Sequence, residues 1–423
     1  MPLSRRGLLA AGGATGVAAA LSACGFSGIG AAERNELSLI TPLFEDAEGK
    51  VALEQTIAGP FLGSHPDLEM SVDYIPWDRL NEKLSTAFAG GLVPDVIMSG
   101  VGWTPPFAEK GIFGELPEDV LDDLAVHERL LDACRFDGKL FALPFQMEGR
   151  FLAYRRAPLE ERGISEDQLP TSLEELREMG KELQGGDLVP FDLFSNNIRQ
   201  TWIHLMAAYG GSLFSEDGTQ VAFDDGTGEA AIEYLITLIE DGSTQFGLRW
   251  AQGQPRPIQQ ERVAMELLNN SVWPTLSEQT PELVNEENMG LFLLPGDAGM
   301  DPVMFLGGTL ISMSGTTNKP EVTQEFLHHA LTPESLIAAS RHGGRAPGVT
   351  ELPDDDVVGA NRFTSYTLEN LDYAGAAEGG SPAWMEIRDQ VGPQVEAAVT
   401  RAQSPAETIA ELKRMTEEAL QRI

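Results

Sequence analysis

Three tryptophans stand beside runs of small and polar residues, where loops could present them to a ligand. Trp103 follows Gly-Val-Gly, Trp273 lies just after Asn-Asn-Ser, and Trp384 follows Gly-Gly-Ser-Pro-Ala. An indole face can stack on the apolar C–H patch of a sugar ring, while carboxylates and amides hold the hydroxyls. One tryptophan alone belongs more often to a hydrophobic core. Three beside such loops favour a binding surface.

A candidate carboxylate, Glu148, lies where the chain is expected to pass from one compact unit to the next. Leu140–Phe145 is short and apolar, as in a strand buried on both faces. Pro144 lacks a backbone donor and is expected to end regular strand pairing nearby. Gln146 and Glu148 follow in a polar interval before a second apolar run. A carboxylate at such a crossover can face the space between two units, where ligand sites tend to lie; the alternative is a solvated loop residue.

The sequence lacks the motifs of nucleotide, metal and hydrolytic sites. The first expected strand ends in Thr-Pro-Leu-Phe, without the Gly-rich turn of a dinucleotide site, and no P-loop is present. There is no His-Glu-x-x-His helix, the histidines show no metal-ligand spacing, and Asp354–Asp356 lacks the alternation of a calcium loop. A Gly-x-Ser-x-Gly elbow is also missing. We therefore expect no cofactor, no metal and no catalytic residue.

Residues 1–24 have the pattern of an export signal. Arg5-Arg6 precede an Ala- and Gly-rich apolar run that is too short to span a bilayer as a permanent helix. The run ends in Leu-Ser-Ala-Cys, which resembles a bacterial lipobox and implies that Cys24 is lipidated as the first mature residue. The alternative, a buried cysteine after an amphipathic helix, is disfavoured because a Gly-rich run makes a poor helix. Residues 25–35 would then form a flexible tether.

Length, composition and charge bound the class of protein. A chain of 423 residues exceeds what one hydrophobic core usually serves, so two domains are expected. The 42% of apolar residues supply those cores. The 65 acidic residues against 29 basic ones give a net charge of −36, which disfavours nucleic acid and anionic lipid as partners. With Cys24 assigned to the lipid, Cys134 is expected to be a buried free thiol.

The first part of the chain alternates strands with helices. Strands are expected at residues 36–41, 68–74 and 95–99, and helices at 48–61 and 80–88. The strands show apolar alternation or continuous burial, and the helices show 3.6-residue spacing. This order predicts a parallel sheet wrapped by helices, an α/β domain whose ligands lie beyond the carboxyl ends of the strands.

The second part continues with helices, a hairpin and two further strands. The expected elements are helices at 171–183, 202–209 and 226–241, a hairpin at 213–223, strands at 289–294 and 305–313, and a helical tail at 382–423. The connector between the two strands is expected to lead the chain back to the first domain. The tail has no strand and is expected to cover the second domain.

Five short motifs occur in a specific order along the chain. They are Gly90–Val96, Phe107–Gly111, Gly138–Pro144, Ala264-Met265 ahead of Trp273, and Phe305–Gly308. Together with the lipobox, their order and spacing resemble the family 1 extracellular solute-binding proteins of ABC importers, the maltose-binding-protein-like group, over nearly the whole mature chain. The resemblance implies an α/β periplasmic-binding-protein fold of two parallel-sheet-based lobes joined by hinge crossovers. The expected lobes are residues 36–146 with 302–340, and residues 147–301 with 341–423.

The resemblance also assigns roles to matching positions. Glu148 falls where the family places a crossover carboxylate on sugar hydroxyls, and Trp273 and Trp384 fall where it places stacking aromatics of the second lobe. Ser99 and Trp103 match the cleft-facing loop after the third strand. The predicted ligand-binding set is Ser99, Trp103, Gln146, Glu148, Asn196, Asn270, Trp273, Gly308, Arg345 and Trp384, with Cys24 as the lipidated residue.

We expect a monomeric, lipid-anchored receptor on the outer face of the bacterial cytoplasmic membrane. It would capture a mono- or oligosaccharide by closure of the lobes and deliver it to the permease of an ABC transporter. Gly102 replaces a charged residue often found in the family at this loop, which argues against a maltodextrin. Arg345 in the cleft would favour a glycerophosphodiester or another polar solute, although a surface role is equally compatible with its sequence. A secreted glycosidase, which needs two carboxylates at catalytic separation, and an adhesin or scaffold lipoprotein remain as alternatives.

Overall fold

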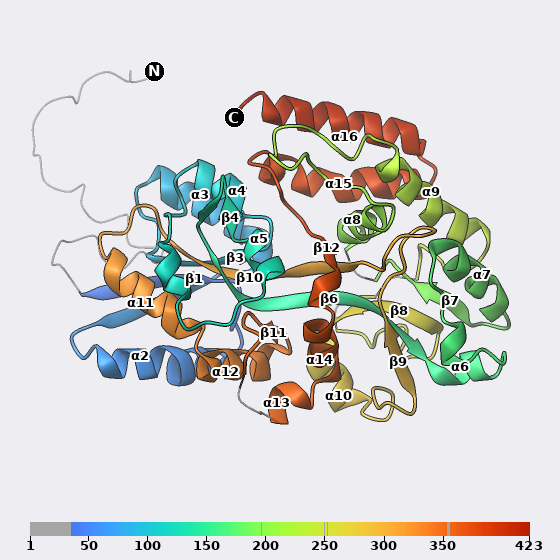
Figure 1. The fold of residues 1–423 in the computed structure, drawn as a ribbon, viewed down its shortest axis with the longest axis horizontal. Helices are drawn as coiled ribbons and strands as arrows, with labels where there is room; N and C mark the ends of the chain where they lie inside the picture. Colours follow the sequence, from blue (N-terminus) through green and yellow to red (C-terminus); the bar gives the residue numbers. More distant parts are fainter. Residues whose placement is uncertain (1–34, 196, 249, 252, 353–355) are drawn as a thin grey trace, which may run out of the picture.

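A mixed sheet crosses the molecule from one end to the other (Figure 1). The computed structural model describes residues 35–195, 197–248, 250–251, 253–352 and 356–423, so the predicted signal segment, Cys24, Asp354 and Asp355 lie outside it. The strands of the sheet are β1 (Glu36–Thr41), β2 (Glu69–Tyr74), β3 (Val96–Gly100), β6 (Leu143–Arg155), β7 (Val189–Asp192), β8 (Val263–Asn269), β9 (Met289–Phe292), β10 (Met304–Met313), β11 (Ala346–Pro347) and β12 (Ala374–Ala376). Their main order is β2-β1-β3-β10-β6-β8-β7. A small separate hairpin pairs β4 (Arg135–Phe136) with β5 (Lys139–Leu140).

Two long strands, β6 and β10, belong to both halves of this sheet. They pair antiparallel with each other from Phe305 opposite Arg150 to Ile311 opposite Leu143. On one side, β10 pairs with β3, which leads to the parallel strands β1 and β2. On the other side, β6 pairs with β8, which is parallel to β7. The predicted α/β class is confirmed, and the parallel strands of the two lobes form one continuous sheet instead of two.

Helices cover both faces of the sheet. They are α1 (Ala47–Val51), α2 (Gly59–Ser64), α3 (Trp77–Ala89), α4 (Thr104–Glu109), α5 (Glu128–Asp132), α6 (Arg156–Glu160), α7 (Leu173–Leu183), α8 (Ile198–Ala208), α9 (Thr227–Glu240), α10 (Trp273–Gln279), α11 (Pro320–Ala330), α12 (Pro333–Gly343), α13 (Asp356–Gly359), α14 (Arg362–Glu369), α15 (Trp384–Val399) and α16 (Pro405–Leu420). In Figure 1, α2, α12, α14 and α10 lie below the sheet. Above it, α3 to α5 cover the left half, and α8, α9, α15 and α16 cover the right half.

The hydrophobic core is continuous on one face of the sheet and divided on the other. Neighbouring strand residues point to opposite faces, so Leu39 enters the lower cluster while Ile40 enters an upper one. Likewise, Phe151 packs below β6 and Leu152 packs above it. The lower cluster runs under both halves, from α2 to α10. The upper face instead carries two separate clusters, which leaves room between them for a site.

Local sequence signals placed several elements correctly, whereas β7, β8, α10 and α14 were not among the predicted elements. The predicted first strand is confirmed at Glu36–Thr41. The predicted helix at 48–61 is divided into α1, a π-helical segment at Ala52–Ala58, and α2. The helix predicted from residue 171 is α7, and Ser172 caps it by accepting a hydrogen bond from the Glu175 N–H. The C-terminal tail forms α15 and α16. Both helices contribute to the upper cluster that contains Leu152, which is called the second-lobe cluster below.

The prediction that Pro144 ends strand pairing is wrong. β6 continues through Pro144 to Arg155, and Pro144 lies opposite Leu310. Thr309 lies opposite Gln146 and Leu310 lies opposite Pro144, so Phe145 is an extra residue of β6. This bulge, next to Pro144, lets the pairing continue past a residue that has no backbone N–H. The polar interval at Gln146 and Glu148 is therefore part of one long strand.

Cys134 is the buried thiol expected from the sequence. Its side chain is 0% exposed, and Sγ donates to the Leu130 carbonyl oxygen at 3.4 Å. Burial raises the pKa of the Cys134 thiol above its ordinary value, because the thiolate would lose its hydration. The group therefore packs as a small apolar side chain.

His204 of α8 gives the folded state a pH dependence. It is fully buried, its Nε2–H donates to the Val303 carbonyl oxygen at 2.9 Å, and burial lowers its pKa to about 3. In the unfolded chain the imidazole binds a proton near pH 6.5, so its stabilising contribution is complete above that pH and is lost as the pH falls. Between pH 7 and pH 5, the free energy of unfolding should fall by about 2 kcal/mol more in the wild type than in His204→Gln. Chemical denaturation of both proteins at the two pH values tests this; equal losses would contradict it.

Candidate functional site

A pocket of about 210 Å³ lies between the two upper clusters, on the face where the core is divided. Its floor comes from Glu148 and Arg150 of β6 and from Phe305–Thr309 of β10. One wall carries Trp77 and Trp103 of the first lobe. The opposite wall and its edge carry polar residues, which are Asn197, Arg199, Gln200, Arg345, Glu378 and Arg388. Residues far apart in the sequence thus meet above the two shared strands.

The aromatic wall presents the partly exposed indole of Trp77, which packs against the buried indole of Trp103. Trp77 begins α3 directly after β2 and is 38% exposed. Its ring packs edge-on against Trp103, with centroids 6.4 Å apart, and Trp103 stacks flat on Phe107 at 5.3 Å. Because Trp103 is only 2% exposed, Trp77 is the residue that offers a surface for stacking. Sequence reasoning chose Trp103 and missed Trp77, although its place after the carboxyl end of a strand was an available signal.

The two sequence-predicted polar residues Glu148 and Arg345 meet in the pocket. Arg345 Nε donates to Glu148 Oε1 at 2.6 Å, and both side chains are about one-fifth exposed. Asn269 Nδ2 also donates to Glu148 Oε2 at 3.4 Å. Arg345 follows Gly344, which ends α12 in the left-handed conformation at φ +63° and so turns the chain toward β6. The pair leaves polar atoms of both residues at the pocket surface.

Glu378 joins three elements of the second lobe. It accepts hydrogen bonds from Arg199 Nε at 3.0 Å and Nη2 at 2.8 Å, from Gln200 Nε2 at 2.8 Å, and from Arg388 Nε at 2.9 Å. Burial alone would raise the pKa of this carboxyl, but Arg199 and Arg388 hold it below its ordinary value. Sequence reasoning missed this cluster because its members come from α8, α15 and the loop before α15.

Arg150 lies in the pocket floor with a buried guanidinium. Its Nη2 donates to Gln200 Oε1, and its guanidinium lies over the Phe305 ring, 4.9 Å from the centroid. Its Nη1 is buried and has no hydrogen-bond partner among the described residues. Burial lowers the pKa of Arg150 to about 10, because the cation is removed from water.

Two glycine backbones bring the lobes into contact beside the pocket. Gly102, after β3, and Gly379, before α15, have φ values of +91° and +98°. A Cβ added to Gly379 would lie 2.3 Å from the Gly102 Cα, and one added to Gly102 would lie 2.6 Å from the Glu378 carbonyl. Only glycine allows both this backbone conformation and this approach. Beyond the contact lies a larger inter-lobe space of about 630 Å³, but Trp77, Glu148 and Arg150 line the smaller pocket, which is therefore the candidate site.

Three other predicted site residues, Asn270, Trp273 and Trp384, contact neighbouring parts of the protein. Asn270 is buried, accepts from the Gly149 N–H at 3.1 Å and donates to the Met147 carbonyl oxygen at 3.1 Å. Trp273 packs edge-on against Phe363, with ring centroids 5.1 Å apart, at the lower core. Trp384 is 0% exposed within the second-lobe cluster. As placed, Trp384 cannot stack on a ligand, because its indole is enclosed by core side chains.

Three further predicted residues, Gly308, Ser99 and Gln146, lie at or near the pocket floor. Gly308 lines the pocket, and its φ of +124° lets β10 approach the Gln146 carbonyl, which a Cβ would meet at 2.3 Å. Ser99 and Gln146 are buried, and their Oγ and Nε2 atoms lack partners among the described residues. Asn196 lies outside the described residues.

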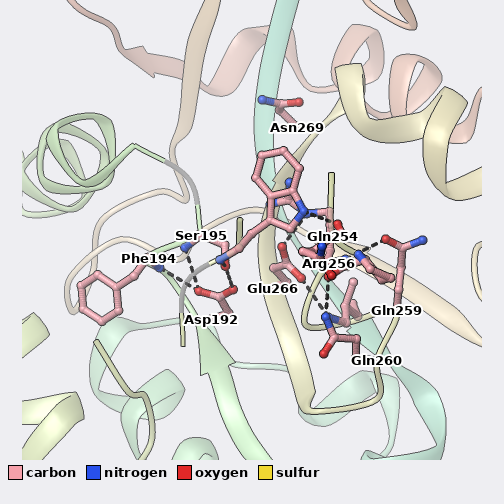
Figure 2. A network of polar contacts seen from close by, with 12 residues as sticks. Asp192, Phe194, Ser195, Gln254, Arg256, Gln259, Gln260, Glu266 and Asn269 are labelled. Carbon is pink, nitrogen blue, oxygen red and sulfur yellow. Dashed lines mark hydrogen bonds and ion pairs between the residues drawn. The ribbon is translucent and has the colours of Figure 1, made fainter. Parts of the chain in front are cut away.

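A second cluster of buried charges lies at the β7 and β8 strands (Figure 2). Arg256 Nε donates to Glu266 Oε1 at 2.6 Å, and the Ile258 N–H donates to Glu266 Oε2 at 3.0 Å. The Trp250 ring covers the Arg256 guanidinium at 5.2 Å. Burial raises the pKa of Glu266 to about 7 against the opposing effect of Arg256. Glu266 is 0% exposed, so this cluster fastens the long loop before β8 to the sheet and does not present a carboxylate to a ligand.

Trp384 and Trp77 should differ sharply in their effect on stability. Trp384→Ala removes a fully buried indole and should lower the free energy of unfolding by about 3–5 kcal/mol, because it leaves a cavity. Trp77→Ala removes a partly exposed ring and should cost much less. Chemical denaturation of both ligand-free variants measures the difference. Equal stabilities would contradict the assignment of Trp384 to the core.

Comparison with known proteins matches residues 56–363 to the family described as "Bacterial extracellular solute-binding protein". A putative binding protein of Brucella abortus is 27% identical over 270 residues, which cover 62% of this chain and only 64% of that relative's length. The diacetylchitobiose binding protein DasA of Streptomyces coelicolor is 24% identical over 95% of this chain and 96% of its own. The sugar-binding protein MalE of Xanthomonas citri has the same fold, with a TM-score of 0.76, 19% identity, and coverage of 92% of this chain and 98% of its own. Because the family match covers more than half of the sequence, this chain belongs to the bacterial extracellular solute-binding proteins.

Proposed function

We propose that this chain is the solute receptor of an ABC importer, and that it captures a carbohydrate between its lobes for delivery to the permease. The observation that carries the proposal is the pairing, in one pocket, of an exposed indole with a network of carboxylates and guanidinium groups. A sugar ring has an apolar face and a rim of hydroxyls, so it complements both surfaces. The names of two similar proteins, a diacetylchitobiose binding protein and a sugar-binding protein, support a carbohydrate ligand.

Capture would use the two shared strands as a common floor. Trp77 stands on the first lobe, while Arg199, Glu378 and Arg388 stand on the second. A small rotation of one lobe about β6 and β10 would bring these walls together over the solute. Exclusion of water would then strengthen the hydrogen bonds to the ligand hydroxyls.

The pocket supports binding without catalysis. Hydrolysis of a glycosidic bond requires one carboxyl group that can give up a proton and a second that is free to act on the sugar. Both carboxylates of the pocket are held by arginines, Glu148 by Arg345 and Glu378 by Arg199. The arginines keep the Glu378 pKa below its ordinary value, which opposes a role as a general acid. The similar proteins named above are binding proteins.

A glycerophosphodiester or another polar solute is the second candidate ligand. The observation that favours it is the position of Arg345, which lines the pocket. A guanidinium group can bind a phosphate through two parallel hydrogen bonds. The ion pair with Glu148 offsets part of this charge, so the carbohydrate remains the first candidate.

We propose that Cys24 anchors the receptor to the outer face of the cytoplasmic membrane. The Leu-Ser-Ala-Cys motif is the support for this step. Among the residues that the structure describes, no helix is long and apolar enough to cross a bilayer. The receptor would act there as a monomer beside its permease.

Replacing Cys24 tests the anchor. Cys24→Ala should move the protein from the membrane fraction to the soluble fraction, because it removes the acylated thiol. Fractionation after a high-salt wash measures the change. Cys134→Ala is the matched control, since that thiol is buried and should leave the distribution as it is. A Cys24→Ala protein that stays with washed membranes would show that the anchor lies elsewhere.

Glu148 tests the carbohydrate site. Thermal-shift screening with saccharides, polyols and phosphodiesters would first identify a stabilising ligand, since a ligand that binds the folded state raises its stability. Glu148→Gln should then weaken binding by about 1.5–3 kcal/mol, because a charge-assisted hydrogen bond is lost. Isothermal titration calorimetry measures the affinity.

The control for this test is Glu115→Gln, which breaks an exposed ion pair with Lys139. That variant should bind like the wild type. Normal affinity in a folded Glu148→Gln protein would remove Glu148 from the site. Failure of every saccharide to stabilise the wild type would contradict a carbohydrate receptor.

A further inference from the structure

The candidate pocket carries more positive than negative side chains. Its carboxylates are Glu148 and Glu378, and its arginines are Arg150, Arg199, Arg345 and Arg388. Glu148 pairs with Arg345, and Glu378 pairs with both Arg199 and Arg388. Arg388 also pairs with the exposed Asp389, which lies outside the pocket, so three of the four arginines have an ion-pair partner and Arg150 does not. This surplus lies within a chain whose net charge is −36.

Arg150 carries the part of this surplus that has no direct counter-ion. Among the described residues, its hydrogen bond from Nη2 goes to the neutral side chain of Gln200, and Nη1 has none. The guanidinium face rests on Phe305, which orients the group without neutralising it. The residue is only 5% exposed. A buried cation without a counter-ion destabilises the protein, so an arginine is unfavourable here unless a ligand supplies the negative charge.

We propose that the solute carries an acidic group, a carboxylate or a phosphate, that binds Arg150 in the pocket floor. This inference rests on the proposed function and names the chemical class of its ligand. The acidic group accepts a hydrogen bond from Arg150 Nη1 and neutralises the buried guanidinium. The uncharged part of the solute lies against Trp77, which lines the aromatic wall of the pocket. The ligand is then an acidic sugar, a sugar phosphate or a phosphodiester, and a neutral oligosaccharide binds less well.

Binding of matched acidic and neutral compounds tests the proposal. The pairs are glucuronate with glucose, glucose 6-phosphate with glucose, maltobionate with maltose, and the phosphodiester glycerophosphoglycerol with glycerol. Calorimetry should show at least one acidic member binding roughly tenfold or more tightly than its neutral partner, as expected for a charge-assisted bond. The uronate and phosphate arms distinguish a carboxylate from a phosphate, and the last pair distinguishes a phosphodiester from a sugar. Equal or tighter binding of every neutral partner would overturn the proposal.

Two variants of Arg150 separate charge recognition from a structural effect. Arg150→Met should bring the affinity ratio of the acidic to the neutral compound close to one. Arg150→Lys keeps the charge and should recover part of the ratio. The matched control is Arg155→Met on the same strand, whose arginine pairs with Glu261 outside the pocket. An unchanged ratio in folded Arg150→Met, or the same fall in Arg155→Met, would overturn the assignment.

Inorganic phosphate provides a test that does not depend on a sugar. Millimolar phosphate should raise the melting temperature of the wild type, relative to equal ionic strength of sodium chloride, and should raise that of Arg150→Met less. No difference between the salts and no acidic preference would overturn the acidic subsite. Neutral saccharides that bind in that case would leave the carbohydrate receptor standing. Strong binding of phosphate without binding of any saccharide would instead contradict the carbohydrate ligand and support the anion subsite.

Discussion

The antiparallel pairing of β6 with β10 is the constraint on which the rest of this structure depends. Both strands run through both lobes, so their ladder sets the floor of the pocket and the distance between its walls. Gly308 shows how close this pairing is, since a Cβ there would collide with the Gln146 carbonyl. The hydrophobic cluster below the strands is continuous, while the clusters above them are separate. On the upper face, where the polar residues gather, the two lobes therefore share no common hydrophobic cluster.

Buried charge distinguishes this pocket from an ordinary cleft. Glu378 is almost fully enclosed, and two arginines and a glutamine satisfy its oxygens. Such a group is stable only while its partners are present, because an isolated buried charge is costly. The cluster thus fixes the relative positions of α8, α15 and the loop before α15. The same side chains that stabilise the second lobe also form one wall of the pocket.

The two sets of buried ion pairs in the second lobe have different surroundings. Glu266 and Arg256 are enclosed beneath Trp250 and hold a long loop against the sheet. Glu378 and Arg388 instead border the inter-lobe pocket, where Arg388 keeps a quarter of its side chain exposed. Accessibility, and not the kind of residue, separates a structural pair from one that can bind a ligand. The Trp77 indole illustrates the same rule, because it is exposed while the Trp384 indole is not.

The sequence by itself determined the class of fold, the alternation of strands and helices in the first part of the chain, and the choice of Glu148 and Arg345, which the structure brings together. The class and the elements follow from local periodicity, caps and composition, which act over a few residues and can be seen without the rest of the chain. Only the tertiary structure decided that Trp77 is exposed, that Trp384 is core, and that Arg199, Arg388 and Glu378 form one cluster. Burial and charge pairing depend on which distant segments pack together. Local patterns in a single sequence do not reveal that packing.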